Sequence, residues 1–144
     1  MNRTRPTRET LHMKTAELWA QRSTCKRPQR LVGCVITTTD LKRILAIGYN
    51  GPPFGLSNDS CRDVTGDCGC IHAEANAVAA VDSTILGKVI FTTLEPCENC
   101  AGLITQANIR KVYYINEYRD HKGLERLKAC GIEVEQLKPD NYQG

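Results

Sequence analysis

The sequence has few aromatic residues, no strong excess of charge and no long apolar run. Aromatic residues make up 6% of the 144 positions, with a single Trp, which is little material for stacking nucleic-acid bases. The net charge of +3 is too small to indicate nucleic-acid binding by itself. The apolar runs are too short to span a bilayer, and the first residues, MNRTRPTRET, lack the apolar core of a signal peptide. We therefore expect a globular protein with no membrane partner.

The eight cysteines are the most informative feature that the sequence does contain. In a secreted chain an even number would suggest disulfide bonds. Without an export signal, close spacings such as Cys97/Cys100 favour metal ligation or reduced thiols, so we expect a cytoplasmic protein. Cys34, in an apolar strand, and Cys130, at a helix end, are expected to be small core residues.

The apolar pattern predicts one α/β domain over residues 1–144, with residues 1–9 as a frayed basic lead-in. We expect helices at 9–22, 72–81, 97–107 and 123–130, and strands at 31–39, 43–50, 88–93, 111–116 and 132–137. A hairpin followed by alternating helices and strands predicts a five-stranded mixed sheet with helices on both faces, a three-layer α/β/α sandwich. A helix separates the last two strands, so these can run parallel through a right-handed crossover.

Two short motifs, each at the start of a helix, provide the candidate chemistry. Cys97 and Cys100, in LEPCENC, lie on one helical face, and the helix N-terminus favours the thiolates that zinc binds. His72, in IHAEANA, would be a third ligand and would leave the fourth position to water, as in catalytic zinc sites. Glu74 points in a different direction from His72 and can accept a proton from that water. Taken singly, each motif has an ordinary alternative: a solvated histidine, a redox-active cysteine pair or half of a zinc ribbon.

Together, H-x-E and P-C-x-x-C form the zinc deaminase pattern, and the chain resembles the zinc-dependent cytidine and deoxycytidylate (dCMP) deaminases. The blocks RSTCKR, GYNGPPFG, HAEANA, TTLEPCENCAGLITQANIRKVYY and GLERLKACGIEV carry the resemblance, which covers roughly residues 10–137. It implies the cytidine deaminase-like fold and hydrolysis of dCMP to dUMP and ammonia, supplying dUMP for thymidylate synthesis. It also implies that His72, Cys97 and Cys100 hold a catalytic zinc and that Glu74 is the proton shuttle.

A nucleotide substrate requires a phosphate site, and the basic loop QRSTCKRPQR, residues 21–30, is the candidate. Within it, Arg27 is the preferred phosphate ligand because a guanidinium can bind phosphate through two hydrogen bonds, and Ser23 adds a hydroxyl. By resemblance, Asn50 binds the sugar 3′-hydroxyl, and Ala73 and Tyr118 line the substrate site. The alternatives are a solvated basic loop and, for Asn50, an ordinary Asn-Gly turn.

Four further cysteines form a second candidate metal site: Cys25, Cys61, Cys68 and Cys70. The resemblance implies that some dCMP deaminases carry a second, structural zinc, with ligands in the segments that hold Cys25 and Cys61. We therefore expect a closed four-cysteine zinc site that fixes the Gly-rich loop 51–70, because zinc supplies folding energy that such a loop cannot draw from packing. Unligated thiols or a disulfide are the alternative.

The resemblance also implies a homo-oligomer, a hexamer in many members, that dCTP activates and dTTP inhibits through the GYNGPPFG loop. This regulation stays open, because residues 51–55 equally suit a plain Gly/Pro turn. Two other functions also remain open. A deaminase of another cytosine nucleotide, or of a base in tRNA or single-stranded nucleic acid, would share the zinc chemistry, although the scarcity of aromatic residues disfavours nucleic acid. A non-enzymatic zinc-binding module would have no use for Glu74.

Overall fold

The computed structural model describes residues 4–27 and 30–138. Its elements, in chain order, are α1 (Arg8–Ala20), β1 (Gly33–Thr37), β2 (Ile44–Tyr49), the short 3₁₀ helix η2 (Asn58–Ser60), α2 (Ala73–Ala80), β3 (Lys88–Leu94), α3 (Glu98–Gln106), β4 (Ile109–Asn116), α4 (Lys122–Ala129) and β5 (Glu133–Gln136). The four helices and five strands expected from the sequence are confirmed in type and order, with ends that differ by no more than two residues. The short η2, within the loop after β2, was not expected from the sequence.

The five strands form one mixed sheet in the order β2-β1-β3-β4-β5. The β1–β2 hairpin is antiparallel, and β1 also pairs antiparallel with β3. Strands β3, β4 and β5 are parallel to one another, which confirms the expectation for the last two strands. In parallel segments of this kind, ligands bind beyond the carboxyl ends of the strands. A ligand-binding site is therefore expected at the loops after β3 and β4.

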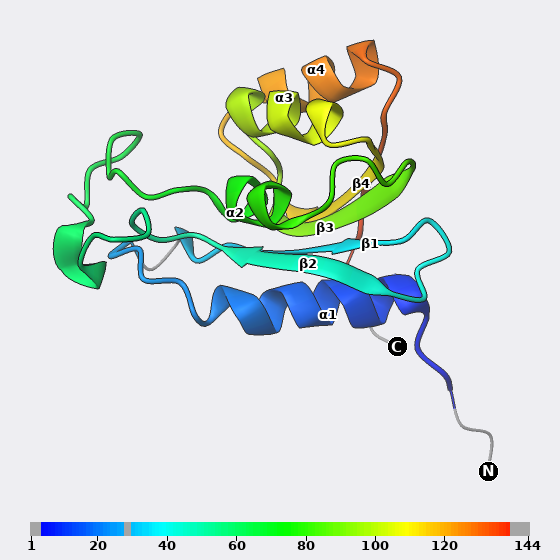
Figure 1. Cartoon of the computed structure of the whole chain (residues 1–144), viewed down its shortest axis with the longest axis horizontal. Coiled ribbons are helices and arrows are strands. Elements are labelled where there is room, and N and C mark those ends of the chain that lie inside the picture. Colours follow the sequence, from blue (N-terminus) through cyan, green and yellow to red (C-terminus); the bar gives the residue numbers. More distant parts are fainter. Residues whose placement is uncertain (1–3, 28–29, 139–144) are drawn as a thin grey trace.

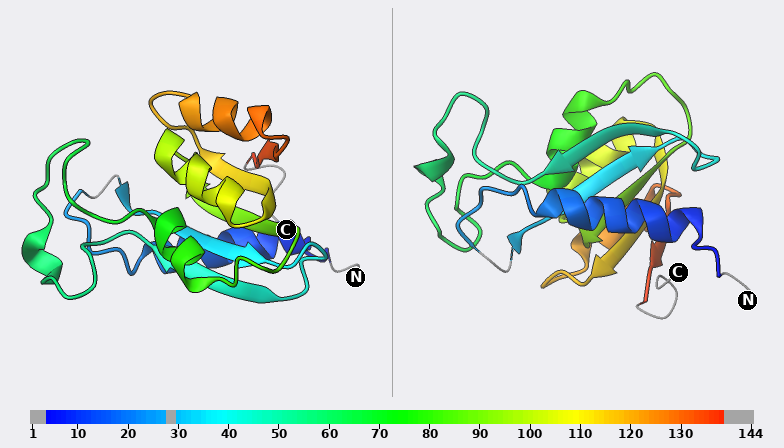
Figure 2. Two further views of the ribbon diagram at one scale, coloured as in Figure 1. Left: turned by 45° about the horizontal axis from the view of Figure 1, so that its top comes forward. Right: turned by 90° about the horizontal axis from the view of Figure 1, so that it is seen from below.

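Helices cover both faces of the sheet, which confirms the three-layer α/β/α sandwich (Figures 1 and 2). Because successive side chains of a strand alternate between faces, each strand supplies two cores. Cys34 and Ile36 of β1 pack on the side of α2, α3 and α4, whereas Val35 packs on the side of α1. The core that contains Cys34 and Ile36 also contains Ala73 and Ala77 of α2, whose small side chains let that helix lie close to the sheet.

Gly48 of β2 fixes how closely α2 approaches the sheet. A Cβ atom at this position would lie 2.2 Å from the carbonyl oxygen of Ala73, in the first turn of the helix. One turn further along, the side-chain amide of Asn76 donates to the carbonyl oxygen of Tyr49 at 2.8 Å. The N-terminus of α2, which carries the H-x-E motif, is thus held tightly against the end of β2.

Two expectations from the sequence need correction. Helix α1 already begins at Arg8, because the Thr7 side chain caps it by accepting a hydrogen bond from Thr10 N, so the lead-in expected over residues 1–9 is too long. Residues 1–3 of that lead-in lie outside the described residues. Cys130 is exposed instead of buried, because α4 ends before it and the chain turns away at Gly131, whereas Cys34 is a fully buried core residue as expected.

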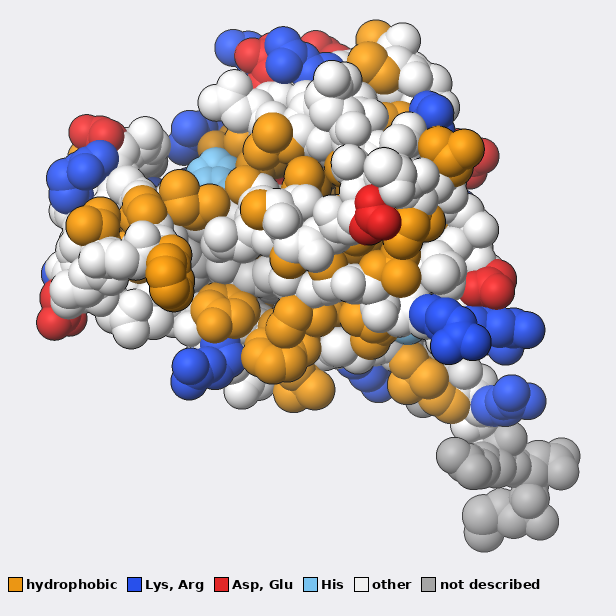
Figure 3. Space-filling view, viewed as in Figure 1, with side chains coloured by type: hydrophobic (Ala, Val, Ile, Leu, Met, Phe, Trp, Pro, Cys, Tyr) orange, Lys and Arg blue, Asp and Glu red, His pale blue; other side chains and the backbone are white. Residues whose placement is uncertain are grey.

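Apolar side chains gather on the surface over α1 and β2 (Figure 3). Leu18 of α1 and Ile44 of β2 are exposed, and the rings of Trp19 and Tyr49 stack with their centroids 6.2 Å apart, joining the two elements. Across the described ranges, no helix combines the length and the apolar character needed to span a membrane.

Candidate active site

His72 and Glu74 leave the start of α2 in different directions. His72 is the N-cap residue of the helix, and its side chain makes no capping hydrogen bond, which leaves the ring for another partner. Glu74 lies in the first turn and is only 4% exposed. The spacing of the motif therefore places an imidazole at the helix start and a buried carboxylate beside it.

The histidine ring meets both cysteines of the second motif. Cys97 is the N-cap residue of α3, where its sulfur accepts a hydrogen bond from Cys100 N. The Nδ1 atom of His72 lies 3.5 Å from the Sγ atom of Cys97 and 3.4 Å from that of Cys100. Tetrahedral ligands with ordinary zinc bond lengths would be about 3.6 Å apart. The three side chains therefore have the composition and the spacing of a zinc site with one position left open.

The charges in this cluster suit a cation. A hydrogen bond from the Cys100 thiol lowers the pKa of Cys97 to about 4, while the Cys97 sulfur raises the pKa of Cys100 above its usual value. The hydrogen bond to Cys97 also raises the pKa of His72. A metal ion would displace the protons that these groups share, because zinc ligands bind in their deprotonated forms.

Burial raises the pKa of Glu74 to about 7, well above that of an exposed carboxyl group. A group that titrates near neutrality can both take up and release a proton at physiological pH. Glu74 is thus suited to acid and base roles within one reaction.

The cluster opens into a cavity of about 400 Å³ at the carboxyl ends of β3 and β4. Four of the residues expected at the substrate line this cavity: Arg27, Asn50, Ala73 and Tyr118. Among the described residues that line the cavity, Ser23, the fifth residue expected at the substrate, is absent. Its hydroxyl oxygen accepts a hydrogen bond from Cys25 N at 3.3 Å.

The lining residues are held by specific contacts. Oδ1 of Asn50 accepts from Val32 N at 2.9 Å, and its amide nitrogen donates to the carbonyl oxygen of Arg30, so Asn50 joins two loops as well as facing the cavity. A guanidinium nitrogen of Arg27 donates to the hydroxyl oxygen of Thr65 at 2.8 Å. Arg27 therefore reaches across from the basic loop to the loop after β2.

Sequence reasoning overlooked further cavity-lining residues, several of them in or next to the loop after β4. The guanidinium carbons of Arg30 and Arg119 lie 5.8 Å and 5.0 Å from the centre of the Tyr118 ring. Lys122 and the buried Glu95 also line the cavity. The available signal was position: the segment YRDHKG directly follows a strand in the parallel part of the sheet, where ligands bind.

The four remaining loop cysteines also come together. The Sγ atoms of Cys25, Cys61, Cys68 and Cys70 all lie within 4.8 Å of one another, and those of Cys25 and Cys61 are 3.9 Å apart. The ligands of a tetrahedral zinc–thiolate site would be about 3.8 Å apart. The backbone N–H of Lys26 lowers the pKa of Cys61 to about 7, whereas burial raises that of Cys25. The arrangement fits a closed four-thiolate metal site.

Comparison with known proteins agrees with this geometry. Residues 6–116 match the family model of the cytidine and deoxycytidylate deaminase zinc-binding region. The chain belongs to this deaminase family. It is 39% identical to the deoxycytidylate deaminase of Mus musculus over 142 residues, which cover 88% of this chain and 78% of that one.

Two further members of the family show how the length and the fold of this chain compare with those of its relatives. It is 33% identical to the deoxycytidylate deaminase of Schizosaccharomyces pombe, covering 97% of this chain but 47% of that protein, so it spans about half the length of this curated relative. A crystal structure of the dCMP deaminase of cyanophage S-TIM5, in complex with dCMP and dUMP, superposes with a TM-score of 0.80 at 38% identity. The matched region covers 94% of this chain and all of the cyanophage chain, and this agreement confirms the cytidine deaminase-like fold.

Proposed function

We propose that this chain converts dCMP to dUMP and ammonia by hydrolytic deamination at C4 of the cytosine ring. The proposal is carried by one observation: the buried carboxylate of Glu74 lines the same cavity as a His–Cys–Cys cluster of zinc-site dimensions. The relatives named above are deoxycytidylate deaminases, and the cyanophage protein holds dCMP and dUMP, which supports this choice of substrate. The dUMP formed would supply thymidylate synthesis. We also propose that residues 1–144 act as one deaminase domain.

The proposed mechanism assigns the proton transfers to Glu74. Zinc, held by Nδ1 of His72 and the sulfurs of Cys97 and Cys100, would bring the pKa of a water molecule near neutrality. Glu74 would take one proton from that water and give it to ring N3 as the water oxygen bonds to C4. It would then take the remaining proton of that oxygen and give it to the amino group, so that the C4–N bond breaks, ammonia leaves and the C4 carbonyl of dUMP forms. Both roles can fall to one carboxyl group because Glu74 is buried in the cavity wall, two residues from His72, where it can reach both the water and the substrate ring.

The cavity walls supply the proposed nucleotide contacts. Arg27 would bind the phosphate through paired hydrogen bonds, and Arg119 and Lys122 add positive charge to the same cavity. Ser23 lies beside the cavity-lining Cys25, from whose backbone N–H it accepts a hydrogen bond, so its hydroxyl hydrogen stays free to donate to a phosphate at the edge of the cavity. Two further contacts complete the proposal: the Asn50 amide with the sugar 3′-hydroxyl, and the walls formed by Ala73 and Tyr118 with the rest of the nucleotide.

We further propose that the four-cysteine cluster holds a second, structural zinc. All four cysteines are free thiols and not disulfide-bonded, and free thiols persist in a reducing compartment, which is one reason to propose a cytoplasmic location. A closed site with four protein ligands leaves no position for substrate, so this zinc would stabilise the loops and take no part in the reaction.

Regulation and assembly belong to the same proposal. The exposed apolar side chains over α1 and β2 offer a surface for a homo-oligomer, with a hexamer as the expected form. The GYNGPPFG loop would bind dCTP as activator and dTTP as inhibitor. Following dCMP turnover while dCTP is titrated tests this, and a flat response excludes it.

The decisive experiment compares ammonia release from dCMP, cytidine, dCTP and tRNA by the purified, zinc-loaded chain. We expect efficient turnover of dCMP and much poorer turnover of cytidine, which lacks the phosphate. Equal efficiency on both would refute the phosphate site, and preference for tRNA would refute the substrate assignment. Arg27→Ala should mainly raise KM for dCMP and leave cytidine turnover unchanged, whereas the control Arg22→Ala, an exposed position of the same loop, should change neither.

A further inference from the structure

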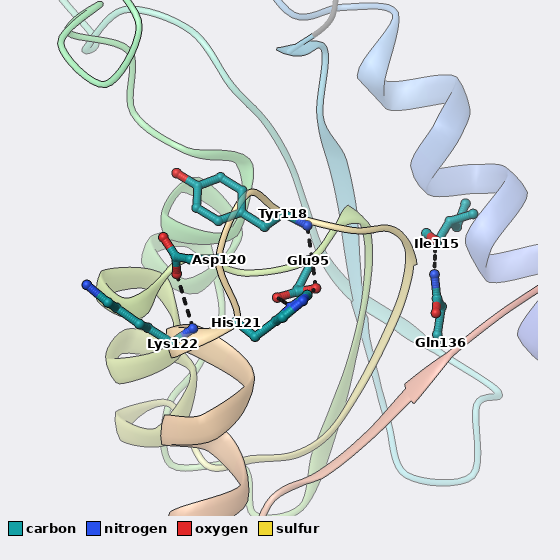
Figure 4. A network of polar contacts seen from close by, with 7 residues as sticks. All are labelled: Glu95, Ile115, Tyr118, Asp120, His121, Lys122 and Gln136. Atoms are coloured by element: carbon teal, nitrogen blue, oxygen red, sulfur yellow. Dashed lines mark hydrogen bonds and ion pairs between the residues drawn. The ribbon is translucent and has the colours of Figure 1, made fainter.

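Glu95 is a buried carboxylate that the proposed reaction does not use. It follows β3, two residues before Cys97, and its side chain is 0% exposed. Burying an ionised carboxylate is costly unless it is paired and hydrogen-bonded. Its two oxygens lie 3.1 Å and 2.9 Å from Nδ1 of His121, and Tyr118 N donates to one of them at 3.4 Å (Figure 4).

These contacts join two neighbouring segments that both line the cavity. One is the turn 95–98, which carries the proposed metal ligand Cys97, and the other is the segment 117–122, which consists of the loop between β4 and α4 and the first residue of α4. The backbone N–H of Glu95 also donates to the carbonyl oxygen of Asn116 at 2.8 Å. A Cβ atom on Gly123 would lie 2.0 Å from the carbonyl oxygen of Pro96, so the first turn of α4 packs directly on the cysteine turn.

The segment 117–122 carries side chains that face the substrate cavity. Tyr118, Arg119 and Lys122 all line it, and the Arg119 guanidinium lies over the Tyr118 ring. The backbone N–H of Tyr118 is itself one of the donors to Glu95. A shift of the loop would therefore displace both the aromatic wall and a positive charge, while the metal ligands on α2 and α3 could stay in place.

We propose that Glu95 and His121 are positioning residues, which hold the Tyr118–Arg119 wall at a fixed distance from the metal-ligand turn so that the nucleotide is bound in register with Glu74. The inference rests on the proposed deamination of a nucleotide. In this positioning role, Glu95 and His121 contact neither the substrate base nor the sulfur atoms of Cys97 and Cys100. It acts through the loop, so its loss should weaken substrate binding more than it slows the reaction of bound substrate.

His121→Ala is the main variant, because the His121 side chain is 58% exposed and its removal leaves no buried cavity. We expect KM for dCMP to rise about tenfold, with kcat changed less than about twofold and zinc content unchanged, the size expected for one charge-assisted hydrogen bond. His121→Asn should restore most of the affinity, because its amide nitrogen takes the place of Nδ1. The matched control is Lys128→Ala, at an exposed position of the same helix, which should behave like the unmodified chain.

Hydrogen exchange of the peptide containing residues 117–122 gives a readout that does not depend on turnover. We expect faster exchange there in His121→Ala and near-normal exchange in His121→Asn and Lys128→Ala. If the unmodified chain fails to deaminate dCMP, the proposed function fails, and this measurement still tests the link between Glu95 and the loop. Unchanged KM with unchanged exchange would overturn the proposal.

A second pattern would also overturn it. If His121→Ala loses zinc and kcat while KM stays constant, the pair supports the metal-ligand turn and not the substrate wall. Glu95→Gln provides the reciprocal variant should His121→Ala fold poorly, because glutamine keeps the volume and an oxygen acceptor for Tyr118 N. We expect Glu95→Gln to raise KM in the same direction, and an unaltered KM in this variant counts against the inference.

Discussion

Replacing Cys61 by serine should remove one zinc ion per chain and destabilise the loops around it. Cys61 is buried in the four-cysteine cluster, where its sulfur lies 3.9 Å from that of Cys25, 36 positions earlier. A cross-link that closes a loop of this length lowers the conformational entropy of the unfolded chain, which adds about 4 kcal/mol to the free energy of unfolding. Losing most of this contribution should lower the melting temperature by about 10 °C in a domain of this size.

The assay is elemental analysis of purified protein combined with thermal unfolding. We expect about two zinc ions per chain in the unmodified protein and about one in Cys61→Ser, with the catalytic cluster keeping its ion. Cys130→Ser is the matched control, because Cys130 is exposed and belongs to neither cluster. It should retain two zinc ions and the original melting temperature.

One result would refute this reasoning directly. If the unmodified protein contains a single zinc and Cys25, Cys61, Cys68 and Cys70 are all freely alkylated in the folded state, the second site does not exist. A Cys61→Ser variant that melts at the unmodified temperature with unchanged zinc content would lead to the same conclusion.

Two further substitutions separate chemistry from packing around α2. Glu74→Gln should keep its zinc but lose at least about a hundredfold in turnover, because the amide cannot carry the proton; measurable activity near the original rate would remove Glu74 from the mechanism. Gly48→Ala should cost about 3 kcal/mol of stability, since its Cβ would lie 2.2 Å from the Ala73 carbonyl oxygen, and thermal unfolding measures this. Its control, Gly102→Ala, meets only the flexible end of Arg126 at 3.4 Å and should be neutral or stabilising; equal effects of the two would contradict the packing argument.

The local features were predictable because each depends on residues close in sequence. The helix starts at His72 and Cys97 are visible as motifs, and the short apolar runs predict β1 and β3, which are buried on both faces of the sheet. The burial of Cys34 follows from its place in such a run. The prediction that Cys130 is a core residue was wrong, because a residue at a helix end can face the core or the solvent. Only the packing of α4 decides which of the two it faces.

Other features could not be predicted because they depend on where the sheet brings distant loops. Glu95 has no local sign of its partner, since His121 lies 26 positions later and reaches it only through the β3–β4 pairing. The same holds for Arg119, whose place on the cavity wall follows from the carboxyl end of β4. A charged residue in a loop reveals its partner only once the strand order is known.

The two candidate metal clusters are not independent, because the three-residue segment 70–72 connects them. Cys70 belongs to the four-cysteine cluster and His72 to the catalytic cluster. Ile71, between them, exchanges two backbone hydrogen bonds with Gly51, at 2.7 Å and 3.2 Å. The entry into α2 is therefore held at two successive residues, Cys70 and Ile71, before the helix begins. The imidazole of His72 has no capping bond to orient it, so the anchored backbone before it helps to set the direction of this proposed metal ligand. A structural zinc at Cys70 would then stabilise the geometry of the proposed catalytic site without touching the substrate.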